Sequence, residues 1–318
     1  MDLSQVAEIL RKATKARVET DFSLARYTTY RLGGPAALYI EPESAHDLEL
    51  LGSALRDADH ASPRPPVLVL GRGSNLVISD EGFDGVVIRM AGGYAWLRRS
   101  GPTGVVAGSS STLPQLANWA ARRSLTGMEF AISIPGSVGG AVRMNAGAHD
   151  GEIADSLTSV TLFDLERLEL RQPEASALGF SYRRSNLTEN DLVIDATFEL
   201  EPGDPGDIRD RMEQHRRHRS STQPGAAQNA GSVFKNPAGR AAGQLVEAAG
   251  LKGFRVGGAT VSELHANFMM ADEGATAQDV FDLVQTVRRK VREDSGIELE
   301  PEVRFVGSFD TTAAEVSG

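Results

Sequence analysis

The chain has 318 residues, 41% of them hydrophobic and 24% charged, so it can bury a sizeable core and has the composition of an ordinary soluble protein. Its formal net charge of −10 argues against nucleic acid or an anionic membrane as the main partner, and the absence of cysteine excludes disulfides, thiolate nucleophiles and iron–sulfur sites. The sequence shows no signal peptide and no apolar run near the roughly 20 residues that span a bilayer. We therefore expect a cytoplasmic protein that acts on small molecules, with no membrane insertion and no obligate protein partner.

Helix and strand patterns follow one another in the N-terminal part. Apolar residues at helical spacing predict an amphipathic helix over residues 3–10, and residues 36–40 predict a strand. Ser44 and Asp47 form a plausible capping box for a second helix. After a proline-rich break, the uniformly apolar run 67–70 predicts a strand that is buried on both faces.

This strand leads into a glycine-containing loop whose N–H groups and hydroxyls suit phosphate oxygens. It lacks the third glycine of the dinucleotide fingerprint and the Lys-Ser/Thr end of a Walker loop, so a plain β-turn remains an alternative to nucleotide binding. Residues 78–107 then favour β-structure, and 113–120 predict a helix. The loop residues are Gly71, Arg72, Gly73, Ser74, Asn75 and Leu76.

A second glycine-rich stretch spans residues 132–147. Glycines allow a close approach of the backbone to a bound group, and consecutive N–H groups make an anion-binding concavity for a phosphate or pyrophosphate. The alternative is a tight structural turn packed against a strand. Its candidate binding residues are Gly136, Ser137, Gly139, Gly140 and Gly147.

The following segments predict strands near 160–163 and 192–198, and a change of composition at 201–206 marks a domain boundary. A charged helix follows over residues 207–219. It contains His215 and His218, for which we favour a solvated basic face near an anionic ligand over a metal site, because no carboxylate pattern accompanies them.

The C-terminal part combines a polar loop, two helices and a final strand. The loop 229–237 groups glycine, hydroxyl, aromatic, amine and amide side chains; Ser232 in it lacks the Gly-x-Ser-x-Gly context of a nucleophile, and a structured turn remains open. Helices predicted over 244–249 and 276–296 serve core packing. Residues 297–307 alternate with period two, and the tail from Ser308 is expected to be disordered and dispensable.

Taken in order, five of these segments resemble the bacterial UDP-N-acetylenolpyruvoylglucosamine reductase family, and the match runs from about Thr28 to Gly307. Single motifs would be weak, but five in this order are highly specific. They are Gly-x-Gly-Ser-Asn-Leu (71–76), Ile-Pro-Gly-Ser-Val-Gly-Gly-Ala with Met-Asn-Ala-Gly (134–147), Tyr-Arg-x-Ser (182–185), Ala-Gly-Ser-x-Phe-Lys-Asn-Pro (230–237) and Leu-Glu-Pro-Glu-Val-Arg (299–304).

The resemblance implies an α+β architecture with the FAD-binding fold of the vanillyl-alcohol oxidase type. Two FAD-binding subdomains would cover residues 1–66 and 67–203, and a C-terminal α/β substrate domain would cover 204–318. Both glycine loops would bind FAD without a covalent link. NADPH would reduce the flavin, which would pass a hydride from N5 to C3 of UDP-N-acetylglucosamine enolpyruvate, making UDP-N-acetylmuramate for peptidoglycan synthesis.

By the same resemblance, Arg183, Ser232 and Glu302 are the catalytic residues. Ser232 corresponds to the proton donor to C2. Arg183 would stabilise the charge that develops on the substrate carboxylate, and Glu302 would have to be protonated, which a closed site favours. Substrate contacts of second rank are Tyr182, Lys235, Asn236 and Arg304, and no metal is expected.

The sequence also departs from the family pattern. Arg72 stands where small or amide residues are common, and His149-Asp150 where Tyr-Gly is frequent; both changes are expected to affect flavin affinity. No insertion between Ile194 and Ser232 carries an additional substrate-binding tyrosine, which indicates the shorter subclass. The alternatives are a flavin oxidase or dehydrogenase of the same fold with another substrate, and a flavin-binding protein that has lost turnover.

Overall fold

The computed structural model describes residues 2–59, 64–225 and 227–311. The chain forms two compact units, each assembled from separated segments. The first unit comprises residues 1–21, 37–72 and 84–219, and the second unit comprises residues 22–36, 73–83 and 220–318. The predicted division into three domains after residues 66 and 203 stays a prediction.

The first unit contains a four-stranded sheet of order β1-β2-β5-β3 and a five-stranded antiparallel sheet of order β12-β11-β13-β7-β6. The helices and strands that lie wholly or mainly in it are α1 (Leu3–Ala13), β1 (Arg17–Ser23), β2 (Pro35–Glu41), α2 (Ala45–Asp59), β3 (Val67–Leu70), β5 (Phe83–Arg89), β6 (Leu97–Ser100), β7 (Gly104–Gly108), α3 (Leu113–Ala121), β8 (Leu125–Thr126), α4 (Val138–Met144), β9 (Gly147–Ala148), β10 (Gly151–Glu152), β11 (Leu157–Asp164), β12 (Glu169–Arg171), β13 (Asp191–Glu199), β14 (Glu201–Pro202) and α5 (Pro205–Thr222).

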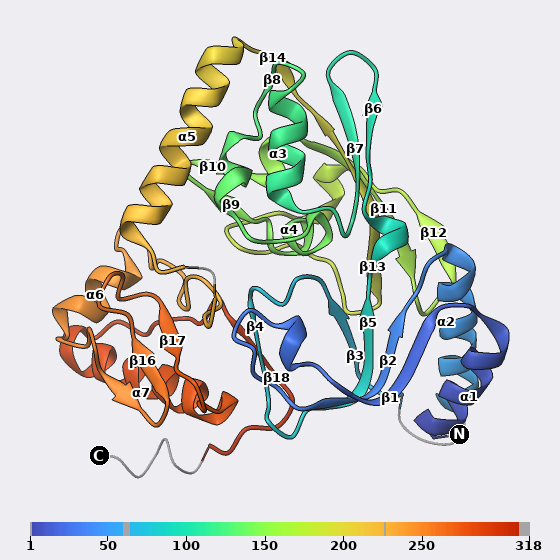
Figure 1. The fold of residues 1–318 in the computed structure, drawn as a ribbon, viewed down its shortest axis with the longest axis horizontal. Helices are drawn as coiled ribbons and strands as arrows, with labels where there is room; N and C mark the ends of the chain where they lie inside the picture. Colours follow the sequence, from blue (N-terminus) through green and yellow to red (C-terminus); the bar gives the residue numbers. More distant parts are fainter. Residues whose placement is uncertain (1, 60–63, 226, 312–318) are drawn as a thin grey trace. The chain divides into compact units, whose positions relative to one another are not determined.

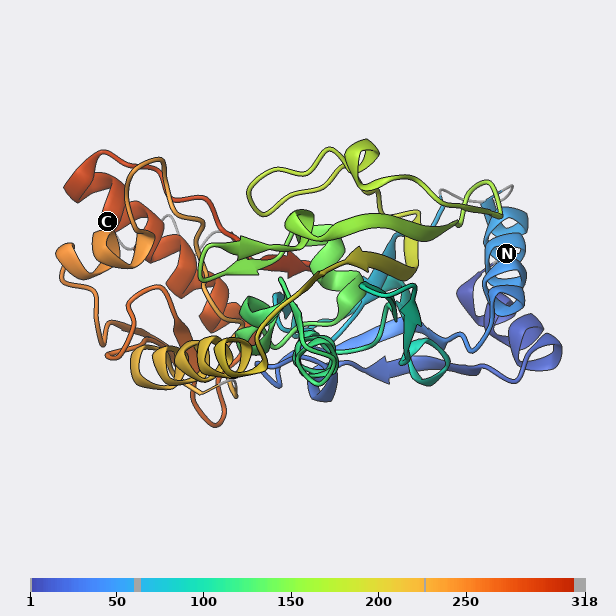
Figure 2. The ribbon, with the colours of Figure 1, turned by 90° about the horizontal axis from the view of Figure 1, so that it is seen from above.

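Helices α1 and α2 lie side by side in both ribbon views (Figures 1 and 2). The predicted capping box of α2 is confirmed, because the Asp47 N–H donates to Ser44 Oγ over 3.3 Å and the Ser44 N–H donates to Asp47 Oδ2 over 3.0 Å. The apolar stripe of α1 packs into a core shared with α2 and the four-stranded sheet. Ile9 is the exception in that stripe, since its side chain is 46% exposed.

A second core of the first unit joins the five-stranded sheet to α3 and α4. Val160 of β11 pairs with Ala196 of β13, and Val105 of β7 pairs with Phe198, so the predicted alternation of apolar residues places one row of side chains in this core. Helix α3 begins at a capping box formed by Thr112 and Gln115. The sheet and its two helices therefore hold the loops at the ends of β7 and β13 in fixed positions.

The second unit contains a three-stranded antiparallel sheet of order β15-β16-β17 and a two-stranded parallel sheet of β4 and β18. The helix stripe predicted over residues 280–291 is confirmed: α7 begins at a Thr276–Asp279 capping box, is capped at its end by Gly296 and buries the side chains of the predicted stripe completely. The helices and strands of this unit are β4 (Leu76–Ile78), α6 (Ala242–Ala248), β15 (Arg255–Val256), β16 (Ala259–Val261), β17 (Met269–Ala271), α7 (Ala277–Ser295) and β18 (Arg304–Val306).

The end of the chain differs from the prediction in two ways. The period-two segment 297–307 forms a strand only over Arg304–Val306, because only these residues pair with β4. The tail is not disordered from Ser308: Phe309 stacks on Phe281 with ring centroids 4.9 Å apart, and Asp310 exchanges two backbone hydrogen bonds with the Gln278 side chain. Residues 312–318, for which disorder was also predicted, lie outside the described residues. No helix in the described part of the chain is long and apolar enough to cross a membrane.

Candidate functional site

A cavity of about 400 Å³ lies in the first unit, where the parallel strands β3 and β5 end. Ligands of sheets with parallel strands bind at the carboxyl ends of those strands, and this volume is within the usual range for small-molecule sites. The lining residues come from the ends of β3 and β5, from the end of β7, from α4 and from β13: Glu41, Val69, Leu70, Gly71, Arg72, Arg89, Met90, Ala91, Gly92, Ala95, Ser109, Ser110, Ser137, Gly139, Gly140, Arg143, Asp191 and Val193.

The structure brings together part of the predicted cofactor set. Both glycine loops reach the cavity, since Gly71, Arg72, Ser137, Gly139 and Gly140 line it. Gly136 and Gly147 are not among the lining residues, and Gly73, Ser74, Asn75 and Leu76 belong to the second unit. Cofactor contacts of all eleven predicted residues stay predictions.

Close packing disfavours a larger residue at two of the lining positions. A Cβ on Gly139 would lie 3.0 Å from Ser109 Cβ, and the Gly139 N–H donates to the Ser109 carbonyl oxygen over 2.8 Å. A Cβ on Gly71 would lie 2.5 Å from Ser137 Oγ, the hydroxyl that caps α4. The small residues therefore let the start of α4 approach the ends of β3 and β7 and form the wall of the cavity.

Two polar groups of the cavity are candidate ligand contacts. Ser109 Oγ is buried without a hydrogen bond among the described residues, and the Arg72 guanidinium belongs to a residue that lines the cavity. A buried hydroxyl left unpaired is costly, which indicates a ligand atom as its partner. A guanidinium at this position matches a phosphate group. This donor set fits a dinucleotide such as FAD.

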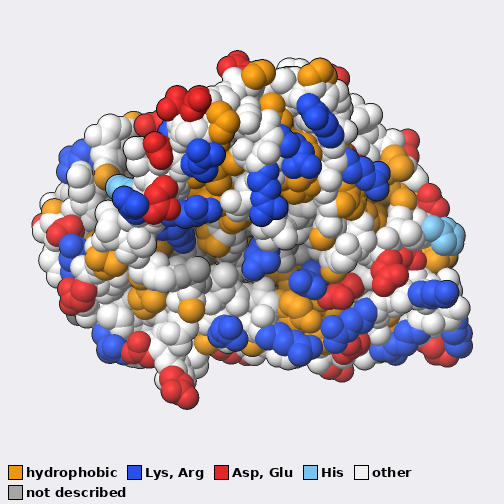
Figure 3. Space-filling view, turned by 45° about the horizontal axis from the view of Figure 1, so that its top comes forward, with side chains coloured by type: hydrophobic (Ala, Val, Ile, Leu, Met, Phe, Trp, Pro, Cys, Tyr) orange, Lys and Arg blue, Asp and Glu red, His pale blue; other side chains and the backbone are white. Residues whose placement is uncertain are grey.

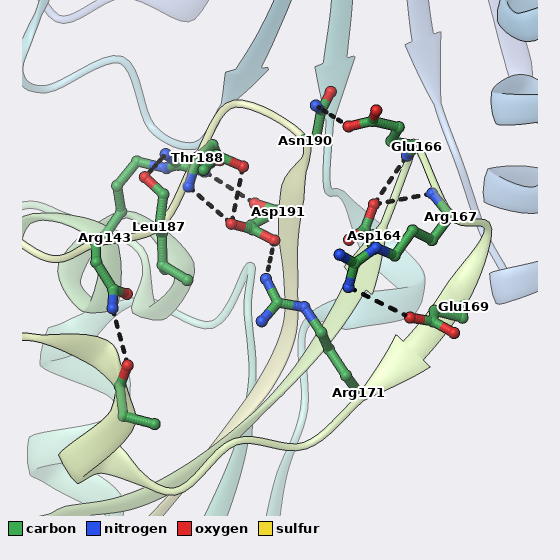
Figure 4. Close-up of polar contacts among 12 residues, drawn as sticks. Arg143, Asp164, Glu166, Arg167, Glu169, Arg171, Leu187, Thr188, Asn190 and Asp191 are labelled. Atoms are coloured by element: carbon green, nitrogen blue, oxygen red, sulfur yellow. Dashed lines mark hydrogen bonds and ion pairs between the residues drawn. The ribbon is translucent and has the colours of Figure 1, made fainter.

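Arg143 and Asp191 line the cavity, and Figure 4 shows their polar contacts. The Arg143 guanidinium donates to the carbonyl oxygens of Leu187, Thr188 and Asp191 over 3.2, 2.8 and 2.8 Å. Burial by itself raises the pKa of the Asp191 carboxyl, but hydrogen bonds from the Thr188 N–H and hydroxyl and from the Arg171 guanidinium outweigh it and hold the pKa below its usual value. Asp191 is therefore an ionised anchor of the 187–191 segment, and the sequence analysis identified neither Arg143 nor Asp191.

The predicted pair Tyr182 and Arg183 occupies a two-residue turn in the first unit, closed by backbone hydrogen bonds between Ser181 and Arg184. Arg183 has φ +56°, a left-handed backbone conformation that arginine rarely adopts. Its Nη2 donates to the Gly147 carbonyl oxygen over 2.6 Å, and its Cζ lies 4.8 Å from the centre of the Tyr182 ring. The Tyr182 side chain is exposed.

The second unit brings Ser232 and Glu302 onto adjacent segments. The Glu302 N–H donates to the carbonyl oxygen of Val233 over 2.7 Å, and the Glu302 carbonyl oxygen accepts a hydrogen bond from Asn75 Nδ2 over 3.0 Å. Asn267 fixes the next residue of the loop, since its amide exchanges two bonds of 2.9 Å with the Phe234 backbone. Asn75, predicted only as a cofactor ligand, thus holds the backbone of a predicted catalytic residue.

The predicted substrate contacts of the second unit have partners elsewhere in the same unit. Lys235 Nζ lies 2.6 Å from Glu300 Oε1, and Asn236 Oδ1 accepts the N–H of Ala242 at the start of α6 over 2.9 Å. The Arg304 side chain is exposed, and its backbone N–H donates to the Asn75 carbonyl oxygen over 3.0 Å. The substrate roles of these residues stay predictions.

The comparisons with known proteins agree with this geometry. Residues 36–166 match the family described as FAD binding domain, and residues 223–306 match the C-terminal domain of UDP-N-acetylenolpyruvoylglucosamine reductase. Over 309 residues the chain is 43% identical to UDP-N-acetylenolpyruvoylglucosamine reductase 2 of Symbiobacterium thermophilum, with 96% of this chain and 98% of the relative covered. Over 289 residues it is 44% identical to the reductase of Rubrobacter xylanophilus, with 90% and 94% covered.

A solved structure shows the same likeness. The UDP-N-acetylenolpyruvylglucosamine reductase of Thermus caldophilus superimposes with a TM-score of 0.77 at 37% identity, covering 92% of this chain and 100% of that one. Fold and matches together define an FAD-binding oxidoreductase. The chain belongs to the UDP-N-acetylenolpyruvoylglucosamine reductase family. The FAD cofactor and the fold implied by the sequence resemblance are thereby confirmed, and a different flavin oxidase or a silent flavin-binding protein is not favoured.

Proposed function

We propose that this chain catalyses the NADPH-dependent reduction of UDP-N-acetylglucosamine enolpyruvate to UDP-N-acetylmuramate, a step in the synthesis of peptidoglycan precursors. Bound FAD supplies the route for the hydride from NADPH to C3 of the enolpyruvyl group. Gly71, Arg72, Ser137, Gly139 and Gly140 hold this cofactor, because they line the cavity of the first unit.

The observation that carries the catalytic part of the proposal is the hydrogen bond between the Glu302 N–H and the Val233 carbonyl oxygen. It ties the segment that carries the acid to the loop that carries Ser232, so the hydroxyl and the carboxyl act on the same end of the substrate. Ser232 donates a proton to C2 as the negative charge develops there. A serine hydroxyl is a weak acid, and it serves as a donor only because it is held next to a strongly basic carbon.

Glu302 and Arg183 stabilise the carboxylate of the substrate while its charge grows. Glu302 acts as a protonated acid that donates a hydrogen bond to a carboxylate oxygen, and Arg183 contributes a fixed positive charge. Preorganised donors of this kind cost no reorganisation during the reaction. Tyr182, Lys235, Asn236 and Arg304 contact the nucleotide sugar outside the reacting group.

The substitution Ser232→Ala tests the proposal. Flavin reduction by NADPH, followed anaerobically by stopped-flow absorbance, is expected to remain near the wild-type rate. Re-oxidation by the enolpyruvyl nucleotide sugar is expected to slow by about 10²–10⁴-fold, the usual contribution of a positioned proton donor. Ser232→Cys, which keeps a proton on a side chain of similar size, serves as the matched control and should retain part of the rate. Equal re-oxidation rates in wild type and Ser232→Ala would remove Ser232 from the mechanism.

A further inference from the structure

Asn145 is a buried polar residue that the proposed mechanism does not use. It forms the C-cap of α4, with φ +42° and a side chain that is 0% exposed. It does not line the cavity. A fully buried amide in the left-handed region is retained only when its hydrogen bonds are satisfied, so the partners of this side chain are informative.

Both ends of the Asn145 amide are occupied. Nδ2 donates to the carbonyl oxygen of Ser181 over 3.2 Å, and Oδ1 accepts the N–H of Ala154 over 3.0 Å. Ser181 is the first residue of the turn that presents Tyr182 and Arg183. The asparagine amide offers a donor and an acceptor on separate atoms, and asparagine also tolerates the left-handed backbone.

Two further bonds tie the same turn to the same end of α4. Arg183 Nη2 donates to the carbonyl oxygen of Gly147, and Ser185 Oγ donates to that of Arg143 over 2.7 Å. Hydrogen bonds therefore hold the first residue of the turn, Arg183 within it, and Ser185 just after it. Arg183 itself is held in an uncommon backbone conformation, which persists only where the surroundings impose it.

We propose that Asn145 is the positioning residue for Arg183: through its bond to the Ser181 carbonyl oxygen, it sets the turn at which the guanidinium is presented to the substrate carboxylate. This inference rests on the proposed role of Arg183. Helix α4 begins at the wall of the cofactor cavity and is capped at its end by Asn145. One short helix therefore sets the position of both the cavity wall and the Arg183 guanidinium. The placement of Arg183 is thereby coupled to the flavin site within a single unit.

Two substitutions at Asn145 test the inference. Asn145→Asp keeps the acceptor for the Ala154 N–H but loses the donor to Ser181. Asn145→Gly loses both bonds and keeps the backbone, because glycine is the residue best suited to a left-handed helix end. Flavin content, the rate of flavin reduction by NADPH, and the rate and KM of anaerobic re-oxidation by the enolpyruvyl nucleotide sugar are measured for each, alone and combined with Arg183→Ala.

Both Asn145 variants are expected to retain flavin and to be reduced by NADPH at a near wild-type rate. Their maximal re-oxidation rate should fall about 10- to 100-fold, as for a catalytic group displaced by about an ångström. In the Arg183→Ala background the same substitutions should have little further effect, since interacting residues are not additive.

The outcomes separate the two proposals. If Arg183→Ala re-oxidises like the wild type, the proposed role of Arg183 fails. If Arg183→Ala is slow but the Asn145 variants are not, or if their effects simply add to that of Arg183→Ala, Asn145 does not act through Arg183. Loss of flavin from both Asn145 variants would show that Asn145 maintains the FAD-binding site, and it would overturn the inference.

Discussion

Two neighbouring serines at the end of β7 show how single residues divide structural and ligand roles. Ser110 and Ser109 both line the cavity. Ser110 Oγ donates to the Ala91 carbonyl oxygen over 3.1 Å, whereas Ser109 Oγ is buried without a partner in the described part of the chain. The unpaired hydroxyl lowers the stability of the protein alone and is available to a cofactor atom.

Ser109→Ala is predicted to leave the free energy of unfolding of the apoprotein unchanged or higher, because it removes an unsatisfied buried group. FAD affinity, measured by titration of the apoprotein, should fall about 2- to 12-fold, the equivalent of one net hydrogen bond. Ser110→Ala is the matched control: it should lower the free energy of unfolding by about 0.5–1.5 kcal/mol and change FAD affinity less. Wild-type FAD affinity in Ser109→Ala would show that this hydroxyl does not contact the cofactor.

At the residue scale, sequence motifs identified the glycines and the proposed catalytic groups but not their supports. Gly139 and Ser232 stand in recognisable local patterns. Asp191 and Ser109 do not, and Asn145 lies in the Met-Asn-Ala-Gly motif but was assigned no role there. The importance of these residues depends on partners elsewhere in the chain, such as Arg171 for Asp191 and Ser181 for Asn145. Local spacing carries no information about such contacts.

At the scale of elements, periodicity and capping predicted the long helices well. The α7 stripe and its Thr276–Asp279 box are read directly from nearby residues. The last strand was predicted too long, because its extent depends on the register with β4, whose Leu76 pairs with Arg304. The alternation of apolar and polar residues within one segment does not show which of its residues pair with a strand so far away in the chain.

The contacts of Phe309 were also not predicted, because the polar and small residues around it in the sequence indicated a disordered tail. Phe281, Phe305 and Phe309 form a cluster with ring centroids 4.9–5.4 Å apart. Phe309→Ala is predicted to lower the free energy of unfolding by about 1–2 kcal/mol, measured by urea denaturation followed by circular dichroism. Phe309→Leu, which keeps most of the apolar contact, should cost less. An unchanged midpoint and slope for Phe309→Ala would mean that this segment does not pack in solution.

At the scale of the whole molecule, the net charge of −10 coexists with local basic groups. Figure 3 shows Lys and Arg side chains next to Asp and Glu side chains over most of the face in view. Within the first unit, His149 stacks on His215 with ring centroids 4.1 Å apart and lies edge-on to His218 at 5.3 Å. The two helix histidines that were predicted to lie on a solvated face thus contact His149, between β9 and β10.

This cluster makes stability depend on pH. Burial lowers the pKa of His149 and of His215, and the neighbouring imidazoles lower both further. Arg219 also lowers the pKa of His149, whereas Asp150 raises it. Arg211 also lowers the pKa of His215, whereas Glu129 raises it. The folded-state pKa therefore lies below the unfolded value of 6.5, and the unfolded chain binds more protons. The contribution of the two neutral histidines to the free energy of unfolding is complete above about pH 6.5, and it is lost as the pH falls through their folded-state pKa.

The melting temperature is accordingly predicted to fall between about pH 7.5 and pH 5.5. Tryptophan fluorescence is a suitable probe, because both tryptophans, Trp96 and Trp119, lie in the first unit with the histidines. His149→Asn, which suits the positive φ of that position, should flatten the dependence. His46→Asn, at an exposed site on α2, should leave it unchanged. A pH dependence that is the same in wild type and His149→Asn would contradict this account.

The most direct test of the central claim is an anaerobic stopped-flow experiment on the purified protein at the flavin absorbance band. We predict that the bound FAD is bleached by NADPH and regains its colour when UDP-N-acetylglucosamine enolpyruvate is added, with UDP-N-acetylmuramate as the product. Reduced flavin that recovers only with oxygen, or a protein that binds no FAD, would contradict the assignment.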